Sequence, residues 1–519
     1  MPLSRPSKHG PVLLAAACLW IAAALTLATS VRRNDGRFVP ALDDTYIHMA
    51  VSNSLAQHGV WGIDGRQFAS CSSSPLWTVL LAGCFRLFGT DPAIPAVLAV
   101  LFATGVLIAG DRLLAALGTG PRARTATLIA VAFAAPLVTL VFVANEHALH
   151  ALLTVALAHA GVRSITDGAP RPAVLALLAA LTVATRYEGM IAVGVVAALL
   201  ALRGRWRSAA SAFLGGLAAI AVFGVWFLSQ GGSFLPTSVL LKAKYPLLDL
   251  PAKIVAFLGP SAVSEALKTP ELATLVLGAV ILAALRVRRT RTPWDPATVL
   301  LAVFSGTALG HMDFARTGEF FRYEAYLVAL GVLAAGAALS DARRPQRAAA
   351  ALIAALIFVP LAVRSFHALR DTPVATTNIY QQQVQVATFV REHYAGSAVA
   401  VNDIGAVAFL GNVRVVDLWG LADHEVADAR RLRAYGPETM RRVVRREGAE
   451  IAVLYERWFE RFGGVPKDWI RVGRWTIPDN KVCGNPTVSF FATAPEARER
   501  LAENLRAFES RLPSPVDTR

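Results

Sequence analysis

The chain contains little charge and little cysteine. Charged residues make up 17% of its 519 residues, whereas a soluble protein carries about 25%. This deficit, with a hydrophobic share of 55% and a mean hydropathy of +0.48, excludes an ordinary soluble enzyme and indicates a membrane protein. Four cysteines are too few for a disulfide scaffold.

Several common motifs are missing as well. Because there is no Gly-x-x-x-x-Gly-Lys-Ser/Thr loop, an ATP-driven transporter is excluded. The serine-hydrolase elbow, the His-Glu-x-x-His zinc helix and the dinucleotide-binding glycine fingerprint are also absent. The net charge of +15 comes without a basic stripe interleaved with aromatics, so we expect no nucleic-acid partner. We expect the positive excess in cytoplasmic loops that face anionic lipid.

Long apolar runs follow one another over the first 364 residues. A membrane-crossing helix needs about 20 apolar residues. The candidates are 11–30, 75–88, 92–117, 125–143, 146–162, 172–202, 208–229, 271–286, 297–310, 322–340 and 347–364. The run 172–202 is long enough for one helix or two, and 75–88 is short enough to begin or end in the interfacial region. The sequence therefore predicts a polytopic α-helical membrane protein with about 11–12 membrane helices.

Basic clusters predict the orientation of these helices. Three arginine-rich segments, at 203–207, 286–291 and 343–347, follow apolar runs and are expected in the cytoplasm. The first loop and everything after residue 365 are then expected on the outer side. One helix at 172–202 gives an odd number of crossings that fits both ends, whereas two helices require another segment to be re-entrant.

The composition changes near residue 365, where polar residues become frequent and apolar runs shorten. Helices are predicted at 378–394, 424–447 and 495–510, and strands at 397–410, 413–418, 450–455 and 486–493. Strands that alternate with helices indicate a small α/β domain. We therefore expect two domains, a transmembrane module over 1–364 and an extracytoplasmic α/β domain over 365–519.

Two adjacent aspartates, Asp43 and Asp44, lie in the first loop. Carboxylates at a membrane surface are costly unless they have a function. On a helix over 43–57, Asp44, His48 and Ser52 share one face, while the two aspartates point about 100° apart. One is expected to face a reacting group as a general base or to hold a divalent metal, and the other to cap the helix or orient a partner.

Short motifs spread along the chain carry a family resemblance. They are 43–47 (DDTYI), 73–77 (SSPLW), 146–149 (EHAL), 185–189 (TRYEG), 235–242 (LPTSVLLK), 402–405 (NDIG) and 415–421 (VVDLWGL). Together they resemble the membrane glycosyltransferases of the GT-C superfamily, most closely the actinobacterial arabinofuranosyltransferases. The similarity to protein O-mannosyltransferases and lipid A aminoarabinose transferases is more distant. Tyr187 replaces a proline and Thr237 an asparagine of the family pattern.

The resemblance implies a glycosyltransferase, with catalysis by Asp43 or Asp44, in the bacterial inner (plasma) membrane. The donor would be a polyprenyl-phosphate-linked sugar, reached from the lipid bilayer. The acceptor would be a hydroxyl of a cell-envelope glycan, lipid or protein on the extracytoplasmic face. Transfer would be inverting, with the first-loop aspartate as general base. No cofactor is required by the motifs, and a divalent cation, Mg²⁺ or Mn²⁺, is left open.

Four further residues are predicted to bind substrate. Because the leaving group is a phosphate, which favours cationic partners, Lys242 and Arg322 are expected to bind it. His48 and Glu146 are expected to line the same pocket. The alternatives are an interfacial lysine for Lys242 and an ion pair with a neighbouring glutamate for Arg322.

Arg186 and Glu188, inside an apolar stretch, support a different class of function. They are expected to neutralise each other as a structural pair. Alternatively, they serve as the coupling pair of a secondary transporter or lipid flippase. Transporters commonly contain inverted repeats, which this sequence does not show. A third reading is a non-catalytic scaffold of an envelope-assembly complex.

Overall fold

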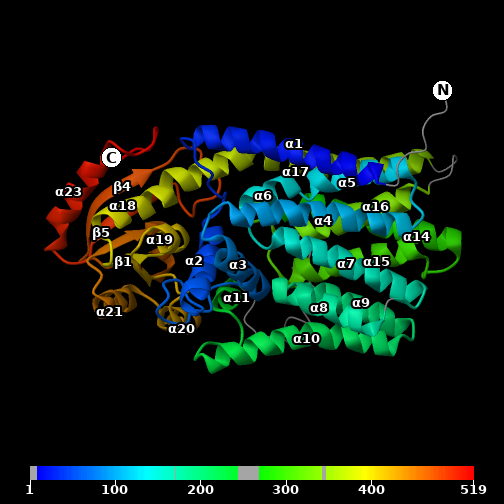
Figure 1. The fold of residues 1–519 in the computed structure, drawn as a ribbon, viewed down its shortest axis with the longest axis horizontal. Helices are drawn as coiled ribbons and strands as arrows, with labels where there is room; N and C mark the ends of the chain where they lie inside the picture. Colours follow the sequence, from blue (N-terminus) through cyan, green and yellow to red (C-terminus); the bar gives the residue numbers. More distant parts are fainter. Residues whose placement is uncertain (1–8, 170, 243–267, 342–346, 519) are drawn as a thin grey trace.

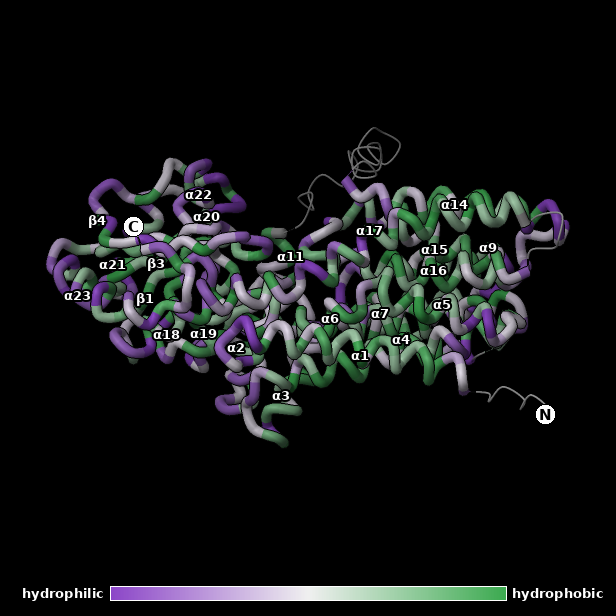
Figure 2. The backbone as a smooth tube through the Cα atoms, turned by 90° about the horizontal axis from the view of Figure 1, so that it is seen from above, coloured by the Kyte–Doolittle hydropathy of each residue, from purple (hydrophilic) through white to green (hydrophobic). Residues whose placement is uncertain are grey.

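The computed structural model describes residues 9–169, 171–242, 268–341 and 347–518. The molecule is elongated, with a helical bundle at one end and a mixed α/β domain at the other (Figure 1). Hydrophobic residues dominate the bundle, and hydrophilic residues are frequent in the α/β domain (Figure 2). The apolar part and the more polar part that the sequence predicts are therefore separate in space.

Eight helices within the described ranges are long and apolar enough to cross a membrane. They are α1 (Gly10–Arg33), α4 (Ile94–Ala116), the pair α5 (Pro121–Ala134) and α6 (Leu137–Val143), α7 (His147–Thr166), α10 (Trp206–Ser229), α14 (Pro270–Thr290), α15 (Pro296–Phe314) and α17 (Arg347–Ile379) with its continuation. Shorter apolar helices are α3 (Pro75–Phe88), α8 (Pro172–Thr185), α9 (Gly189–Leu202) and α16 (Ala325–Leu339). The predicted polytopic helical membrane fold is confirmed.

The run 172–202 forms two helices rather than one. Arg186 has extended backbone angles, φ −153° and ψ 133°, and ends α8. The chain then turns tightly, since a Cβ on Gly189 would lie 2.9 Å from the carbonyl oxygen of Thr182. Only glycine fits this close approach, so the polar residues between α8 and α9 are held at the tip of a helical hairpin. The short helix α3 packs beside α2 (Asp43–His58) near the α/β domain (Figure 1).

The α/β domain is built on a five-stranded sheet with the order β2-β1-β3-β5-β4. Its strands are β1 (Ala398–Val401), β2 (Arg414–Asp417), β3 (Ile451–Leu454), β4 (Ile470–Thr476) and β5 (Thr487–Ala492). The first three strands are parallel, and β5 runs antiparallel to both β3 and β4. The predicted α/β character is confirmed, although the sequence did not indicate β4.

The helices of this domain differ in detail from the prediction. They are α18 (Gln385–His393), α19 (Gly405–Leu410), α20 (His424–Arg431), α21 (Pro437–Glu447), α22 (Glu456–Phe459), the turn η4 (Glu460–Phe462) and α23 (Ala497–Glu509). The predicted strand 397–410 ends at Val401 and is followed by α19. The predicted helix 424–447 is two helices, because Gly436 and Pro437 interrupt it.

One continuous helical path joins the bundle to the α/β domain. It runs through α17, a π-helical segment η3 (Tyr380–Val384) and α18. Side chains of η3 bond to the domain: Gln382 donates to the carbonyl oxygen of Pro486 at 2.9 Å, and Gln383 to the Tyr455 hydroxyl. A shared hydrophobic core contains residues of α2 and of the domain. The first loop and the α/β domain are therefore packed together.

Candidate functional site

A cavity of about 260 Å³ opens where the bundle meets α2. Its walls come from α2, the turn between α6 and α7, the tip between α8 and α9, α11 (Thr237–Lys242) and the segment before α16. Four of the predicted site residues line it together, namely Asp44, His48, Glu146 and Arg322. They come from positions up to 278 residues apart in the chain.

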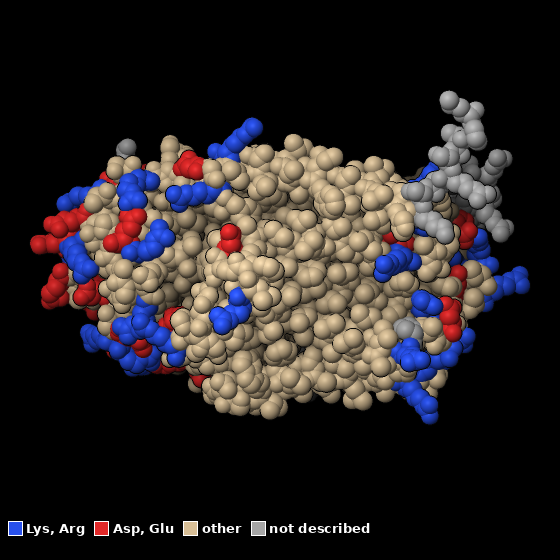
Figure 3. Space-filling view, viewed as in Figure 1, with Lys and Arg blue, Asp and Glu red and all other residues tan. Residues whose placement is uncertain are grey.

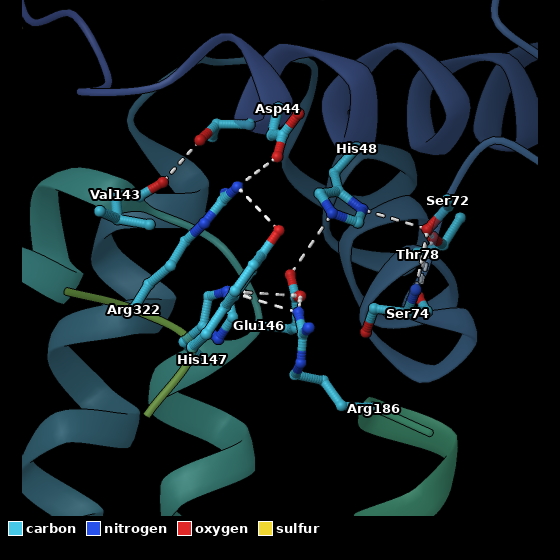
Figure 4. A network of polar contacts seen from close by, with 12 residues as sticks. Asp44, His48, Ser72, Ser74, Thr78, Val143, Glu146, His147, Arg186 and Arg322 are labelled. Atoms are coloured by element: carbon cyan, nitrogen blue, oxygen red, sulfur yellow. Dashed lines mark hydrogen bonds and ion pairs between the residues drawn. The ribbon is translucent and has the colours of Figure 1, made fainter. Parts of the chain in front are cut away.

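Asp44 and Arg322 face each other in this cavity (Figure 4). The guanidinium donates from Nη2 to Oδ2 of Asp44 at 2.5 Å. The Asp44 side chain remains 28% exposed, whereas Arg322 is buried. The ring of Tyr323 lies beneath two cations, with the guanidinium carbons of Arg322 and Arg186 at 5.0 and 5.2 Å from its centroid. The cavity thus holds a partly exposed carboxylate, that of Asp44, beside a buried positive charge.

The backbone before α16 explains how Arg322 reaches the cavity. Glu319, Phe320 and Phe321 all have positive φ angles, of 47°, 59° and 65°. Three consecutive non-glycine residues in this region are costly and persist only where the surroundings enforce them. Glu324 does not pair with Arg322 but binds Arg364 and the backbone N–H of Gly318. The alternative of an ion pair between Arg322 and Glu324 is therefore not what the structure shows.

Glu146 lies at the centre of a second set of ion pairs. It is 1% exposed and accepts from Nη1 of Arg186 at 2.5 Å. Nη2 of the same guanidinium binds Glu188 at 2.8 Å. The expected Arg186–Glu188 pair therefore exists, but it is part of a network that includes Glu146. Burying these charges is tolerable because each carboxylate has a cationic partner.

His48 links this network to the first loop. Its Nε2 lies 3.4 Å from Oε2 of Glu146, and its Nδ1 lies 3.1 Å from the Ser72 hydroxyl (Figure 4). Ser72 also bonds to Thr78 at 2.7 Å. Ser52, expected on the same face, donates instead to the carbonyl of Thr78 and lies against α3. These contacts fix the orientation of the imidazole at the cavity wall.

Asp43 lies away from the cavity. Its carboxylate accepts from the backbone N–H groups of Gly405 at 2.7 Å and Ala406 at 2.8 Å, at the start of α19. Burial raises the pKa of Asp43, and burial together with the Asp43 charge raises the pKa of Asp403 well above its usual range. The two adjacent aspartates, both predicted as catalytic, therefore have separate surroundings. Only Asp44 reaches the cavity.

Arg322 and Lys242 are the two residues that the sequence predicts to bind phosphate. Arg322 lies in the cavity beside Asp44. Lys242 ends α11, and its side chain lies outside the described residues. Ser238 and Val239 of the same helix line the cavity.

The polar residues of the cavity wall that were not predicted as site residues include Asn145, Tyr187 and Ser238. Tyr187 and Ser238 lie inside motifs of the family resemblance, and Asn145 directly precedes the motif 146–149. Their position in or beside these motifs is the signal that was available. Neutral side chains carry no charge pattern that would have separated them from ordinary core or loop residues.

Within the described ranges, no three His, Cys, Asp or Glu side chains gather closely enough to hold a metal ion. Asp44 and Glu146 are both engaged by arginine. The described residues of the cavity therefore form no ready-made site for the Mg²⁺ or Mn²⁺ that the sequence left open.

Family models and curated sequences do not indicate a function for this chain. A domain of unknown function, DUF8728, matches residues 377–491, which lie in the α/β domain and the helix leading into it. No curated protein sequence matches the chain with significance.

Solved structures are more informative about the fold. ArnT from Cupriavidus metallidurans matches in its apo state, with a TM-score of 0.52 and 12% identity over 93% of this chain and 99% of that one. The same protein bound to undecaprenyl phosphate gives 0.50 and 12%, covering 92% and 98%. The archaeal oligosaccharyltransferase AglB from Archaeoglobus fulgidus, in complex with an inhibitory peptide and a dolichol-phosphate, gives 0.50 and 12%, covering 93% and 74%.

These similarities extend over more than nine-tenths of the chain, so they include both the bundle and the α/β domain. At 12% identity they establish the architecture rather than the activity. This chain is a multi-pass membrane protein with the fold of the GT-C glycosyltransferases.

Proposed function

We propose that the protein is a glycosyltransferase that moves a sugar from a polyprenyl-phosphate donor to a hydroxyl acceptor. The acceptor belongs to a cell-envelope glycan, lipid or protein. The fold supports this proposal, because structures with the same architecture contain undecaprenyl phosphate or a dolichol-phosphate. The observation that carries it is the pairing of Asp44 with Arg322 in one cavity.

The pair supplies what an inverting transfer requires. Asp44 acts as the general base and takes the proton of the acceptor hydroxyl, whose oxygen forms the new bond to the anomeric carbon. The bond from that carbon to the phosphate oxygen breaks, and polyprenyl phosphate leaves. Arg322 stabilises the negative charge on the phosphate. A bound phosphate competes with Asp44 for this guanidinium, so donor binding releases the carboxylate.

The proposed orientation places the cavity and the α/β domain on the extracytoplasmic face. The basic segments 203–207 and 286–291 follow α9 and end α14, at the end of the bundle far from the domain (Figure 1). On the face shown in Figure 3, lysine and arginine gather at the two ends of the molecule and are scarce between them. The positive-inside rule then puts the far end of the bundle in the cytoplasm. We assign the protein to the bacterial inner membrane, with residues 1–364 as its catalytic module and 365–519 as its outer domain.

The test compares envelope glycans of cells that lack the protein and are complemented with variants. Wild type is expected to restore the missing glycan in mass spectra, and Asp44→Asn is expected to fail although it reaches the membrane at normal levels. Asp43→Asn is the matched control, because it changes the neighbouring carboxylate outside the cavity. Normal glycans with Asp44→Asn would remove the general base from the proposal. Transport of a substrate in proteoliposomes, without any glycan product, would favour the transporter or flippase instead.

A further inference from the structure

A second cavity, of about 450 Å³, lies wholly within the α/β domain. It is formed by the loop after β2, by α22, by the turn η4 and by the segment before β5. It shares no lining residue with the cavity that contains Asp44. Figure 2 shows α20 and α22 in the hydrophilic domain, outside the apolar bundle. The residues of its wall are Trp419, Arg457, Trp458, Glu460, Arg461 and Gly484.

Two indole rings meet at this cavity. The ring centroids of Trp419 and Trp458 are 4.6 Å apart, and the ring planes are inclined by 48°. Nε1 of Trp458 donates to the carbonyl of Gly484 at 3.1 Å, and a Cβ on Gly484 would lie 2.2 Å from the Trp458 ring. Both indoles are only half-buried, although these contacts fix their orientation. Large aromatic rings that are held in place and stay partly exposed are typical of binding surfaces.

Guanidinium groups lie against the same rings. The guanidinium carbon of Arg430 lies 3.8 Å from the ring centroid of Trp419, and that of Arg461 lies 4.7 Å from the ring centroid of Phe462. Each cation is attracted to a ring face, but the two like charges repel each other. Burial and the charge of Arg461 lower the pKa of Arg430 to about 10. Nε of Arg430 is buried and has no hydrogen-bond partner among the described residues.

No carboxylate in the described part of the chain neutralises this positive charge. Arg430, Arg457 and Arg461 form no ion pair there. Glu460 is the single carboxylate of the cavity wall. Asp417 lies near Arg430, but its carboxylate accepts from three backbone N–H groups of its own loop. Three arginines therefore face one carboxylate at the cavity, and a bound anion would balance them.

The two kinds of side chain select the chemistry of that anion. One face of a sugar ring carries C–H groups, which pack well on the electron-rich face or edge of an indole. The guanidinium fork matches the geometry of a carboxylate or a phosphate. The volume lies within the roughly 300–1,000 Å³ of small-molecule sites, and the charged side chains of the wall are exposed. A saccharide that carries acidic groups satisfies both the rings and the arginines.

We propose that this cavity binds sugar units of an acidic envelope glycan, with sugar rings against Trp419 and Trp458 and acidic groups on Arg457 and Arg461. The site is non-catalytic and separate from the transfer proposed at Asp44. On the orientation proposed above it faces the cell envelope, where it holds the α/β domain to an anionic polymer. The inference does not depend on the role of Asp44.

The test measures binding to the full-length protein in nanodiscs of zwitterionic lipid. The probes are an oligogalacturonate, a phosphorylated oligomannose, neutral maltohexaose and a polyglutamate of similar charge. At least one acidic saccharide is expected to bind about tenfold more tightly than both maltohexaose and polyglutamate. Equal binding of polyglutamate would reduce the site to a general anion surface and overturn the inference. Equal binding of maltohexaose, or no binding of either acidic saccharide, overturns it as well.

Variants assign the binding to this cavity. Arg457→Gln and Arg461→Gln are each expected to weaken binding of the acidic saccharide by about tenfold, the effect of one charge-assisted hydrogen bond. Trp458→Ala is expected to weaken it by about fivefold through lost ring contact. Arg498→Gln is the matched control, because Arg498 is an exposed arginine of the same domain outside the cavity wall. The two arginine variants change exposed side chains, so they test the site even if Trp458→Ala does not fold. Binding as tight as wild type in both of them overturns the inference.

Discussion

The neighbouring carboxylates Asp43 and Asp44 lie in two regions of the molecule with different surroundings. At the interface between α2 and α19, Asp43 is 7% exposed and accepts two backbone N–H bonds. In the cavity, the Asp44 side chain is 28% exposed and binds the guanidinium of Arg322. A carboxylate whose oxygen atoms accept hydrogen bonds from backbone N–H groups is fixed in place. A carboxylate that is bound by a side chain can exchange that side chain for another partner. Under the proposed function, Asp43 positions the helix and Asp44 is the general base.

The largest expected effect comes from the cavity. Arg322→Gln removes the cation beside Asp44, and transfer from a polyprenyl-phosphate sugar is expected to fall by about 10²–10³-fold, the typical loss when one group that stabilises developing charge is deleted. This fall in transfer is measured as the turnover of purified protein in nanodiscs. Arg498→Gln, an exposed arginine of the α/β domain, is the control and should retain full activity. Equal turnover in the two variants would contradict a phosphate role for Arg322.

At the interface, Asp43→Ala is expected to act on stability more than on chemistry. It removes two hydrogen bonds to a charged acceptor, which are typically about 1.5–3 kcal/mol each, and leaves two buried N–H groups of α19 unpaired. The midpoint of thermal unfolding should fall clearly, while turnover of the remaining folded protein declines far less than in Arg322→Gln. An unchanged midpoint would mean that the contact does not hold the first loop to the outer domain.

Gly405→Ala probes the same interface by steric means. An added Cβ would lie 2.2 Å from the backbone oxygen of Asp43, which is incompatible with the present packing. Overpacking of this kind typically costs about 1–3 kcal/mol, so the unfolding midpoint should drop. Gly83→Ala, on α3, meets no atom within 4 Å and should leave the midpoint unchanged or slightly raised. A drop that is the same in both variants would point to a general effect of alanine.

The smallest expected effect is on pH dependence. Burial and the nearby Asp43 charge raise the pKa of Asp403, so the folded state keeps a proton that the unfolded chain loses near pH 3.9. The contribution of Asp403 to stability is full below that pH and is lost as the pH rises through the raised pKa. Asp403→Asn should therefore gain stability relative to wild type as the pH rises from 4 to 8.

Unfolding midpoints across this pH range measure the effect. Asp468→Asn should behave in the opposite way, because a hydrogen bond from Arg441 lowers the pKa of Asp468, and its contribution is lost as the pH falls. Parallel curves for wild type and Asp403→Asn would contradict a raised pKa of Asp403.

The sequence predicted the features that depend on local composition. Apolar runs located the membrane helices, and the composition near residue 365 indicated the α/β domain. Helical periodicity placed Asp44 and His48 on one face of α2, and both line the cavity. It did not show which neighbouring element each polar side chain would contact, so Ser52 was expected at the cavity but lies against α3.

What the sequence did not show depends on contacts between distant segments. The ion pair of Glu146 with Arg186 joins residues 40 positions apart, and that of Asp44 with Arg322 joins residues 278 positions apart. The break between α8 and α9 depends on a glycine that no apolar pattern reveals. The sequence also did not show that the side chains of Asn145, Tyr187 and Ser238 meet at one cavity.

The unbroken helical path from Ala348 to His393 has a mechanical consequence. The α/β domain is joined to the bundle by helix rather than by a loop. Three places on this path can bend: Pro360 and Pro373, because an interior proline removes a helical hydrogen bond, and the π-helical segment Tyr380–Val384. At the last of these, glutamine side chains bond to the α/β domain, so any tilt of the domain relative to the bundle is expected to begin at the prolines.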